Sequence, residues 1–192
     1  MELTTSYILS QFFSTIGYIL LGSTFFLKNR RTILIVGFIN SIFLIIGYWF
    51  LNKYQGMAMV TVGILANIIF FIDEQKNGKT DIIARKDIIM LIILLTYTAI
   101  LTAITYTDLL SLFSVLGTIA WLISVWIKDV KKYKVIAIFT AIFWLVFNIY
   151  ALSISGIITE IILIIASICG LVLHIKSENK NTENLEEKKV EV

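Results

Sequence analysis

The chain has 192 residues, of which 58% are hydrophobic and 15% charged, and it contains no proline. Its mean hydropathy is +0.91. Soluble domains have about 45–50% apolar and about 25% charged residues, so this composition argues against a water-soluble globular fold. One cysteine and one histidine exclude a disulfide framework and a cysteine-ligated metal site within the chain, and no cofactor is expected. A net charge of +3 is too small to indicate nucleic-acid binding.

Apolar runs separated by polar residues predict seven membrane-spanning helices. A spanning helix needs about 20 apolar residues to cross about 30 Å of hydrocarbon. Runs such as IIMLIILL lack the alternation of a membrane β-strand. The segment MELTTSY has an acid and no basic residue, so it is interpreted as the lead-in to a permanent span rather than a signal peptide. The predicted spans are residues 7–27, 33–51, 57–72, 88–106, 109–127, 135–152 and 157–175.

The basic residues predict the orientation of these spans. Fifteen of the 16 lysines and arginines follow the first, third, fifth and seventh spans, and the remaining one is Lys53. Because cytoplasmic loops carry the excess of positive charge, the N-terminus is expected outside and the C-terminus in the cytoplasm. Residues 177–192, SENKNTENLEEKKVEV, are polar and mixed in charge, which predicts a disordered cytoplasmic tail.

An internal repeat is indicated when the chain is shifted by 100 residues, which places residues 14–76 over 114–176. Helix ends, basic loops and turn glycines then coincide, although any evenly spaced helical bundle gives some similarity of this kind. The matched pairs include Ser14 with Ser114, Gly17 with Gly117, Lys28 with Lys128, Gly56 with Gly156, and Ala66 with Ala166.

The repeat predicts an all-α membrane protein with a 3+1+3 layout of parallel repeats, as in SWEET transporters. A three-helix unit crosses the membrane an odd number of times, so one extra helix is needed to give the second unit the same orientation as the first. The expected organisation is a first repeat at 1–76, a linker with the fourth helix at 77–107, a second repeat at 108–176 and the tail at 177–192.

Two segments resemble a known family. LGTIAW at 116–121 and FWLVFNIYALSISGIITE at 143–160 are similar to the W-x-x-x-N, S-x-x-G and G-x-x-x-E pattern of YgjV-type bacterial inner-membrane proteins, as is the turn at 26–31. The resemblance covers residues 8–176 and implies a seven-helix, multi-pass protein of the bacterial inner membrane, related in outline to the SWEET and PQ-loop group. It implies no substrate.

PQ-loop transporters bend at a proline in the first helix of each repeat, and this chain has none. Any movement must therefore use glycines or rigid-body rocking. Gly17, Gly22 and Gly117 are the candidate hinges.

Glu160 is the one charged residue inside a predicted span. Such residues usually face the bundle interior or a wet cavity. Trp144 and Asn148, four residues apart, share one face of the sixth span. A short turn joins the sixth and seventh spans, so Asn148 and Glu160 are both expected in the outer third of adjacent helices. These three side chains could line an outward-facing pocket. Alternatively, Glu160 is a first-turn acid that suits the helix dipole, or it bonds Asn148 to hold two helices together.

A second polar pair is predicted near the membrane midplane. Asn67 lies in the third span, and its repeat partner is Ser167. A midplane polar pair between repeats is where a transporter site is expected, although small polar residues are also common in helix packing. Tryptophans and tyrosines near helix ends are expected to be membrane-interface anchors. They are Trp49, Trp121, Trp126, Tyr48, Tyr54, Tyr106 and Tyr150.

These features predict a small-molecule transporter or facilitator with a central polar site formed by Asn67, Trp144, Asn148, Glu160 and Ser167. The alternative is a non-transporting scaffold or accessory subunit, favoured by the missing prolines and the unequal pair Asn67 and Ser167. An enzyme is not expected, because one intramembrane acid has no nearby base. The expected partners are the lipid bilayer and a small polar solute, with a homo-oligomer left open.

Overall fold

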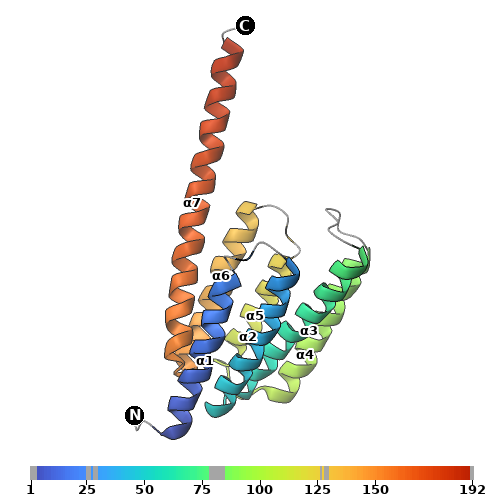
Figure 1. Ribbon diagram of the computed structural model, residues 1–192, viewed down its shortest axis with the longest axis vertical. Helices are drawn as coiled ribbons and strands as arrows, with labels where there is room; N and C mark the ends of the chain where they lie inside the picture. The colour runs from blue at the N-terminus through green and yellow to red at the C-terminus, as the bar shows by residue number, and fades with distance from the viewer. Residues whose placement is uncertain are drawn as a thin grey trace.

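The structure is a computed structural model that describes residues 4–24, 27, 30–77, 85–125, 127 and 130–190, with side chains described as far as residue 172 apart from 30, 74–77, 85, 125, 130 and 131. Within these ranges the chain forms seven helices and no strand, as the sequence predicts, and the helices stand side by side in one bundle (Figure 1). They are α1 (Thr5–Ser23), α2 (Arg30–Phe50), α3 (Tyr54–Asn77), α4 (Arg85–Thr105), α5 (Leu112–Val125), α6 (Val130–Ala151) and α7 (Ile154–Val190).

The outer surface of the bundle is apolar. Side chains such as Ile19, Ile104 and Ile162 are 66%, 73% and 58% exposed, which suits contact with lipid tails rather than water. Five helices are long and apolar enough to cross a membrane by length and composition. They contain the segments Arg31–Phe50, Tyr54–Asp73, Lys86–Thr105, Lys132–Ala151 and Ile154–Val172. The structure therefore supports a multi-pass membrane protein.

The two other helices differ from the predicted spans. The span predicted at 109–127 forms only the 14-residue α5. Asp108 Oδ1 accepts a hydrogen bond from the Ser111 backbone N–H at 2.9 Å, but the turn that follows Asp108 is bonded from residue i to i+3, with the N–H groups of Leu112 and Phe113 donating to the carbonyls of Leu109 and Leu110. The α-helix therefore begins only at Leu112. At 1.5 Å per residue α5 is about 21 Å long, short of a full crossing. The helix α1 has 19 residues, and its polar residues, Gln11 among them, contact other helices and lower its mean hydropathy.

The helix α7 continues to Val190 and projects beyond the rest of the bundle (Figure 1). The sequence places a change from span to disordered tail at residue 177, but no helix end marks that position. The segment 171–190 contains neither glycine nor proline, so its backbone has no residue that stops a helix.

The helices form two groups of three with α4 beside them. In the first group α2 packs between α1 and α3, and in the second α6 packs between α5 and α7. The groups meet along two lines of sparser contact, which we call the α1/α7 seam and the α3/α5 seam. The helix α4 contacts both α3 and α5 and so lies over the α3/α5 seam.

The two turns between long helices have the same backbone design. Asn52 after α2 and Leu152 after α6 have φ values of 56° and 57°, in the left-handed region. The N–H groups of Lys53 and Ser153 donate to the carbonyls of Tyr48 and Asn148, both at 3.0 Å. This is the Schellman ending, which satisfies helix-terminal carbonyls. Asn tolerates this conformation, but a branched residue such as Leu152 is unusual there.

Two of the three candidate hinge glycines lie where helices pack closely. A Cβ on Gly17 would meet Leu44 Cδ2 of α2 at 3.0 Å, and one on Gly117 would meet Trp144 Cδ1 of α6 at 2.6 Å. Gly22 would meet nothing within 4 Å. Gly17 and Gly117 therefore allow α1 and α5 to approach α2 and α6, as small residues do in membrane helix pairs.

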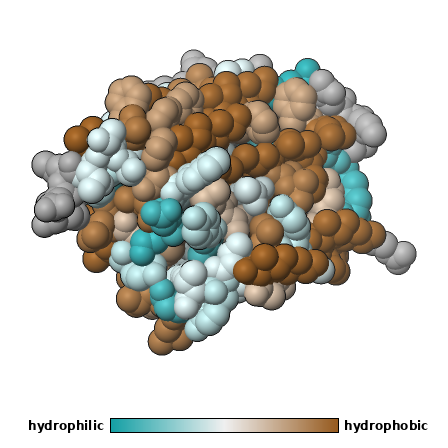
Figure 2. All heavy atoms as spheres, turned by 90° about the horizontal axis from the view of Figure 1, so that it is seen from below, coloured by the Kyte–Doolittle hydropathy of each residue, from teal (hydrophilic) through white to brown (hydrophobic). Residues whose placement is uncertain are grey.

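The end of the bundle that carries the α2–α3, α4–α5 and α6–α7 connections, called the turn end from here on, has a polar centre surrounded by apolar side chains (Figure 2). Here the Tyr150 hydroxyl donates to the Asp108 carboxylate, and Lys53 Nζ lies 3.6 Å from the centroid of the Tyr150 ring. The hydrogen bond from Tyr150 is the main cause that lowers the pKa of Asp108 below its ordinary value. Burial lowers the pKa of Lys53, and the charge of Asp108 opposes that change. These contacts join the α2–α3 and α4–α5 connections to the end of α6.

We predict that Gly117→Ala destabilises the protein by about 1–3 kcal/mol, because the added methyl group overlaps the Trp144 ring and α5 must move away from α6. Gly17→Ala should have a smaller effect, since its contacts are 3.0 Å or longer. The control is Gly22→Ala, which should be neutral or stabilise by about 0.5–1 kcal/mol. Thermal unfolding of the detergent-purified variants measures this order, and equal effects at residues 22 and 117 would contradict the packing described.

We predict that Tyr150→Phe lowers the stability of the protein by an amount that depends on pH. The substitution keeps the ring under Lys53 and removes only the hydroxyl. Because the pKa of Asp108 is lowered in the folded protein, the hydrogen bond stabilises the fold above the usual aspartate pKa of about 4. That stabilisation is lost as the pH falls through the lowered pKa. The Tm difference between wild type and Tyr150→Phe should therefore be largest near pH 7, begin to shrink below about pH 4 and disappear below the lowered pKa of Asp108.

The Asp108→Asn background is the control for this titration. In that background the effect of Tyr150→Phe should be the same at all pH values. A wild-type difference that stays constant from pH 7 to pH 3 would show that Asp108 does not carry the effect.

Candidate functional site

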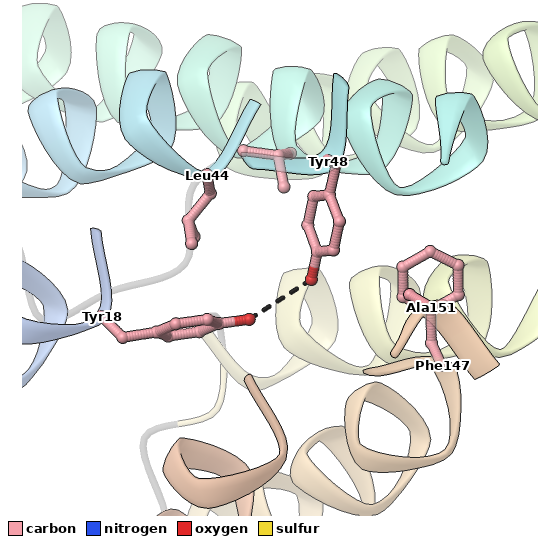
Figure 3. Close-up of a cluster of buried hydrophobic side chains, with 6 residues drawn as sticks. Tyr18, Leu44, Tyr48, Phe147 and Ala151 are labelled. Atoms are coloured by element: carbon pink, nitrogen blue, oxygen red, sulfur yellow. Dashed lines mark hydrogen bonds between the residues drawn. The ribbon is translucent and has the colours of Figure 1, made fainter. Parts of the chain in front are cut away.

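A buried cluster of polar side chains joins the two groups of helices near the turn end. Tyr18 of α1, Tyr48 of α2, Asn148 of α6 and Glu160 of α7 form it, and we call it the tyrosine–glutamate cluster. The Tyr48 hydroxyl donates to Asn148 Oδ1 at 2.8 Å, and the Tyr18 hydroxyl lies 3.3 Å from that of Tyr48 (Figure 3). Tyr18 also donates to Asn148 Oδ1 at the longer distance of 3.5 Å. Asn148 thus accepts from two helices of the other group, α1 and α2.

The local sequence explains why Asn148 reaches this position. It lies in the last turn of α6, and its own carbonyl accepts the Schellman bond from Ser153. The chain then turns into α7, where Gly156 lies against the Asn148 amide. A Cβ at residue 156 would be 2.4 Å from Asn148 Oδ1. Only glycine leaves room for the Asn148 side chain between α6 and α7.

Glu160 lies one turn further along α7 than Gly156 and is buried, with 6% of its surface exposed. Its carboxyl interacts electrostatically with both tyrosine hydroxyls of the cluster. A carboxyl taken out of water is costly unless other polar groups compensate. The cluster therefore supplies a hydroxyl-rich, water-poor environment around a single acid.

Aromatic rings form one wall beside the cluster. The Tyr48 ring is stacked on Trp144 at a centroid distance of 6.4 Å and makes an edge contact with Phe147 at 5.6 Å. Trp144 and Phe147 also meet edge to face, at 5.7 Å. These arrangements are the favoured ones for ring pairs. They fix the Tyr48 ring, and with it the position of its hydroxyl against Asn148.

Three of the five site residues predicted from the sequence lie together in the structure. Asn148 and Glu160 belong to the cluster, and Trp144 is in its aromatic wall. Asn67 instead lies beside α2, where a Cβ on Gly37 would be 3.1 Å from Asn67 Nδ2. Ser167 lies seven residues, about two turns, beyond Glu160 on α7. Its side chain is half-buried.

The two tyrosines of the cluster were not predicted as site residues. Tyr48 was expected to anchor the membrane interface, which is wrong, because it is 1% exposed. Tyr18 gave no signal in the sequence. In the structure, Tyr18 lies four residues after the buried Ser14, which lies four residues after the buried Ser10, so the three share one buried face of α1.

Several buried polar atoms in the described part of the chain have no hydrogen-bond partner. They include Asn148 Nδ2 in the cluster, Ser153 Oγ in the α6–α7 turn and Ser10 Oγ on α1. Buried polar atoms are usually paired with protein or water, so these are donors and acceptors that a bound molecule or ordered water would satisfy. Among the described residues, no group of three or more histidine, cysteine, aspartate or glutamate side chains is placed to hold a metal ion.

A groove of about 710 Å³ runs along the α1/α7 seam next to the cluster. The Tyr18 ring forms part of its lining, so this ring separates the groove from Asn148 and Tyr48. The volume is in the range of small-molecule sites. At its turn end, Gln11 Nε2 donates to the Leu152 carbonyl at 3.2 Å, and Gln11 Oε1 accepts from Ser155 at 3.4 Å.

An apolar outer surface, five long apolar helices and a buried polar cluster together define an integral membrane protein of the helical-bundle class. Comparison with known families gives a match over residues 8–178 to the family described as bacterial inner membrane protein, Imp-YgjV. The chain belongs to this family, which confirms the resemblance noted in the sequence and supports a multi-pass protein of the bacterial inner membrane. No curated protein and no solved structure matches the chain.

We predict that Tyr48→Phe destabilises the protein by about 1–2 kcal/mol, because it removes the shortest hydrogen bond to Asn148 in a buried site. Tyr18→Phe should cost less, since its bonds are 3.3 and 3.5 Å long. Tyr54→Phe is the matched control, because its hydroxyl is exposed and bonds only Asn52 at 3.4 Å. Thermal unfolding of the three variants should give this order. A Tyr48→Phe variant as stable as Tyr54→Phe would contradict the network.

Proposed function

We propose that the protein is a small-molecule transporter or facilitator, not an enzyme, in which two three-helix units, α1–α3 and α5–α7, move against each other around the tyrosine–glutamate cluster. The observation that carries this proposal is the hydrogen bonding of Asn148 in one unit to Tyr48 and Tyr18 in the other. A polar site between two helical units, near a buried acid, is the arrangement that transporters use for binding and coupling.

The proposal includes an internal repeat, which several pairs of residues 100 apart support. The left-handed residues are Asn52 and Leu152, and the turn bonds start at Lys53 and Ser153. Gly17 packs on Leu44 as Gly117 packs on Trp144. Tyr48 and Asn148, which bond each other, are themselves 100 residues apart.

Helix packing gives independent support for a two-fold relation between the units. If α1, α2 and α3 correspond to α5, α6 and α7, a two-fold axis exchanges the α1/α7 seam with the α3/α5 seam. Both seams are present, and in each unit the middle helix contacts its two neighbours. A residue near such an axis lies close to its counterpart, which explains why Tyr48 meets Asn148. Parallel repeats with a linking fourth helix have this symmetry along the membrane normal.

We further propose that all seven helices cross the membrane, with the turn end outside and the opposite end in the cytoplasm. The exposed Leu109 and Leu110 extend the apolar length before α5, and α1 is 19 residues long. Lysine and arginine residues at the starts of α2, α4 and α6, among them Arg31, Lys86 and Lys132, lie at the end opposite the turns. The excess of positive charge on the cytoplasmic side favours this orientation.

In this mechanism the cluster supplies the contacts for a polar solute. The carboxyl of Glu160 attracts a positive group or exchanges a proton, Asn148 Nδ2 offers a free donor, and Trp144 gives an aromatic face. Rocking of the units would separate Asn148 from the two tyrosines and open the site on one side. The close contacts of Gly17 and Gly117 lie within units, so they can persist while the seams between units change.

We predict that Asn148→Ala lowers uptake of the transported solute at least tenfold in proteoliposomes, because it removes the contact between the units and the free donor. A panel of labelled amino acids, sugars and polyamines identifies the solute with the wild-type protein. Asn67→Ala, a polar-to-alanine change outside the cluster, is the control and should keep uptake within about twofold. Monodisperse elution and a measurable Tm establish that each variant is folded.

Unchanged uptake in folded Asn148→Ala would overturn the site. No uptake across the whole panel, together with a partner that co-purifies reproducibly, would favour a scaffold or accessory subunit instead.

A further inference from the structure

The two seams between the helix groups are covered differently. At the α3/α5 seam, α4 packs on both helices and closes the surface toward the membrane. No other helix of the described chain lines the groove on the α1/α7 seam. A fold with two equivalent seams thus has one that is filled by its own helix and one that is open.

The groove opens toward lipid and not toward water at the turn end. Ile19 of α1 and Ile158 and Ile162 of α7 line it and are 66%, 54% and 58% exposed, so its rim is part of the lipid-facing surface. At the turn end Gln11 closes it by bonding Leu152 and Ser155 across the seam. A molecule can therefore enter the groove sideways from the bilayer.

The walls of the groove favour an apolar chain. Two lining hydroxyls bond backbone carbonyls of their own helices: Thr15 Oγ1 donates to the Gln11 carbonyl at 2.7 Å, and Thr159 Oγ1 to the Ser155 carbonyl at 2.8 Å. The remaining lining is largely aliphatic, with Leu21, Leu163 and Ala166 toward the far end. Such a surface gains from covering by hydrocarbon and offers little to a sugar or another polar solute.

The inner side of the groove leads to an acid. The Tyr18 ring lines the groove while its hydroxyl faces Tyr48 and Asn148, and the carboxyl of Glu160 acts electrostatically on that hydroxyl. The Tyr18 side chain thus lies between the groove and the rest of the cluster. The head group that complements a buried carboxyl is a protonated amine, which can also bond the tyrosine hydroxyls.

We infer that the α1/α7 groove is a lateral binding site for a single-chain amphiphilic amine. The apolar chain lies between α1 and α7, and the ammonium group reaches Glu160 past Tyr18. This inference rests on the proposed transport function and names its substrate class: a cationic amphiphile taken from the membrane.

The test uses the full-length protein in phosphatidylcholine nanodiscs and photolabelling with hexadecylamine that carries a diazirine in mid-chain. Hexadecanol with the same diazirine is the matched probe without a charge. The amine probe should label residues 11–22 and 154–166, and unlabelled hexadecylamine should compete with it. Labelling by the amine probe should be at least fivefold stronger than labelling by the alcohol probe. Peptide mapping by mass spectrometry locates the adducts.

Three variants link the labelling to the groove. Thr159→Trp fills the groove and should reduce amine labelling at least fivefold, whereas Ile161→Trp, at an exposed position on α7 outside the lining, should leave it unchanged. Glu160→Gln should lower amine labelling to the level of the alcohol. Equal labelling by amine and alcohol in the wild type, or labelling of folded Thr159→Trp at the wild-type level, would overturn the inference.

The outcome is separable from that of the transport proposal. Saturable groove labelling by the amine without uptake of hexadecylamine or any panel solute supports the binding site and overturns transport. Uptake of a panel solute that depends on Asn148, without groove labelling by the amine, supports transport and overturns this substrate class.

Discussion

The bundle depends on polar contacts between helices whose outer surfaces are apolar. In lipid the hydrophobic effect gives little preference for helix–helix over helix–lipid contact, so association relies on close packing and interhelical hydrogen bonds. In this protein, close packing and interhelical hydrogen bonds occur at the same place. Asn148 is hydrogen-bonded from two helices of the other group, and Gly156 lets α7 approach the Asn148 side chain. The position of Glu160 beside the two tyrosines follows from that packing.

The helices are packed more closely within each group than between the groups, which affects how the two groups can move. Within each group, a glycine in the first helix allows it to pack closely on the second, at Gly17 and at Gly117. Between groups, the seams have sparser contact, and hydrogen bonds from Tyr18, Tyr48 and Gln11 join the two groups. A structure with firm units and weaker seams is suited to rigid-body rocking, and it needs no proline hinge.

The proposed site combines two environments that differ in chemistry. The cluster is polar, enclosed and next to an acid, whereas the groove beside it is apolar and open to lipid. The Tyr18 side chain is the boundary between them and belongs to both. In the proposed mechanism, a bound molecule would therefore meet both environments, the cluster with its head group and the groove with its chain.

The sequence by itself determined the class of protein, the number of helices, the turns near residues 52 and 152 and the family. Backbone N–H and C=O groups in lipid must hydrogen-bond within their own segment, so long apolar runs form helices. It also indicated that Trp144, Asn148 and Glu160 lie close together, because four-residue spacing and a short turn between adjacent helices are local features. The short length of α5 was not predictable from hydropathy, because Leu109 and Leu110 are apolar but lie in a turn bonded from residue i to i+3 ahead of the α-helix.

Only the tertiary structure decided which helices face each other. The partners of Asn148 are 100 and 130 residues away in the chain, so no local pattern marks Tyr48 or Tyr18 as its donors. For the same reason, the sequence does not show that Tyr48 is buried, because its position near a helix end is typical of an interface anchor. Nor does the sequence show that Asn67 packs beside α2. A membrane helix is apolar on nearly every side, so its sequence shows that it is buried in something but not which side meets protein and which meets lipid.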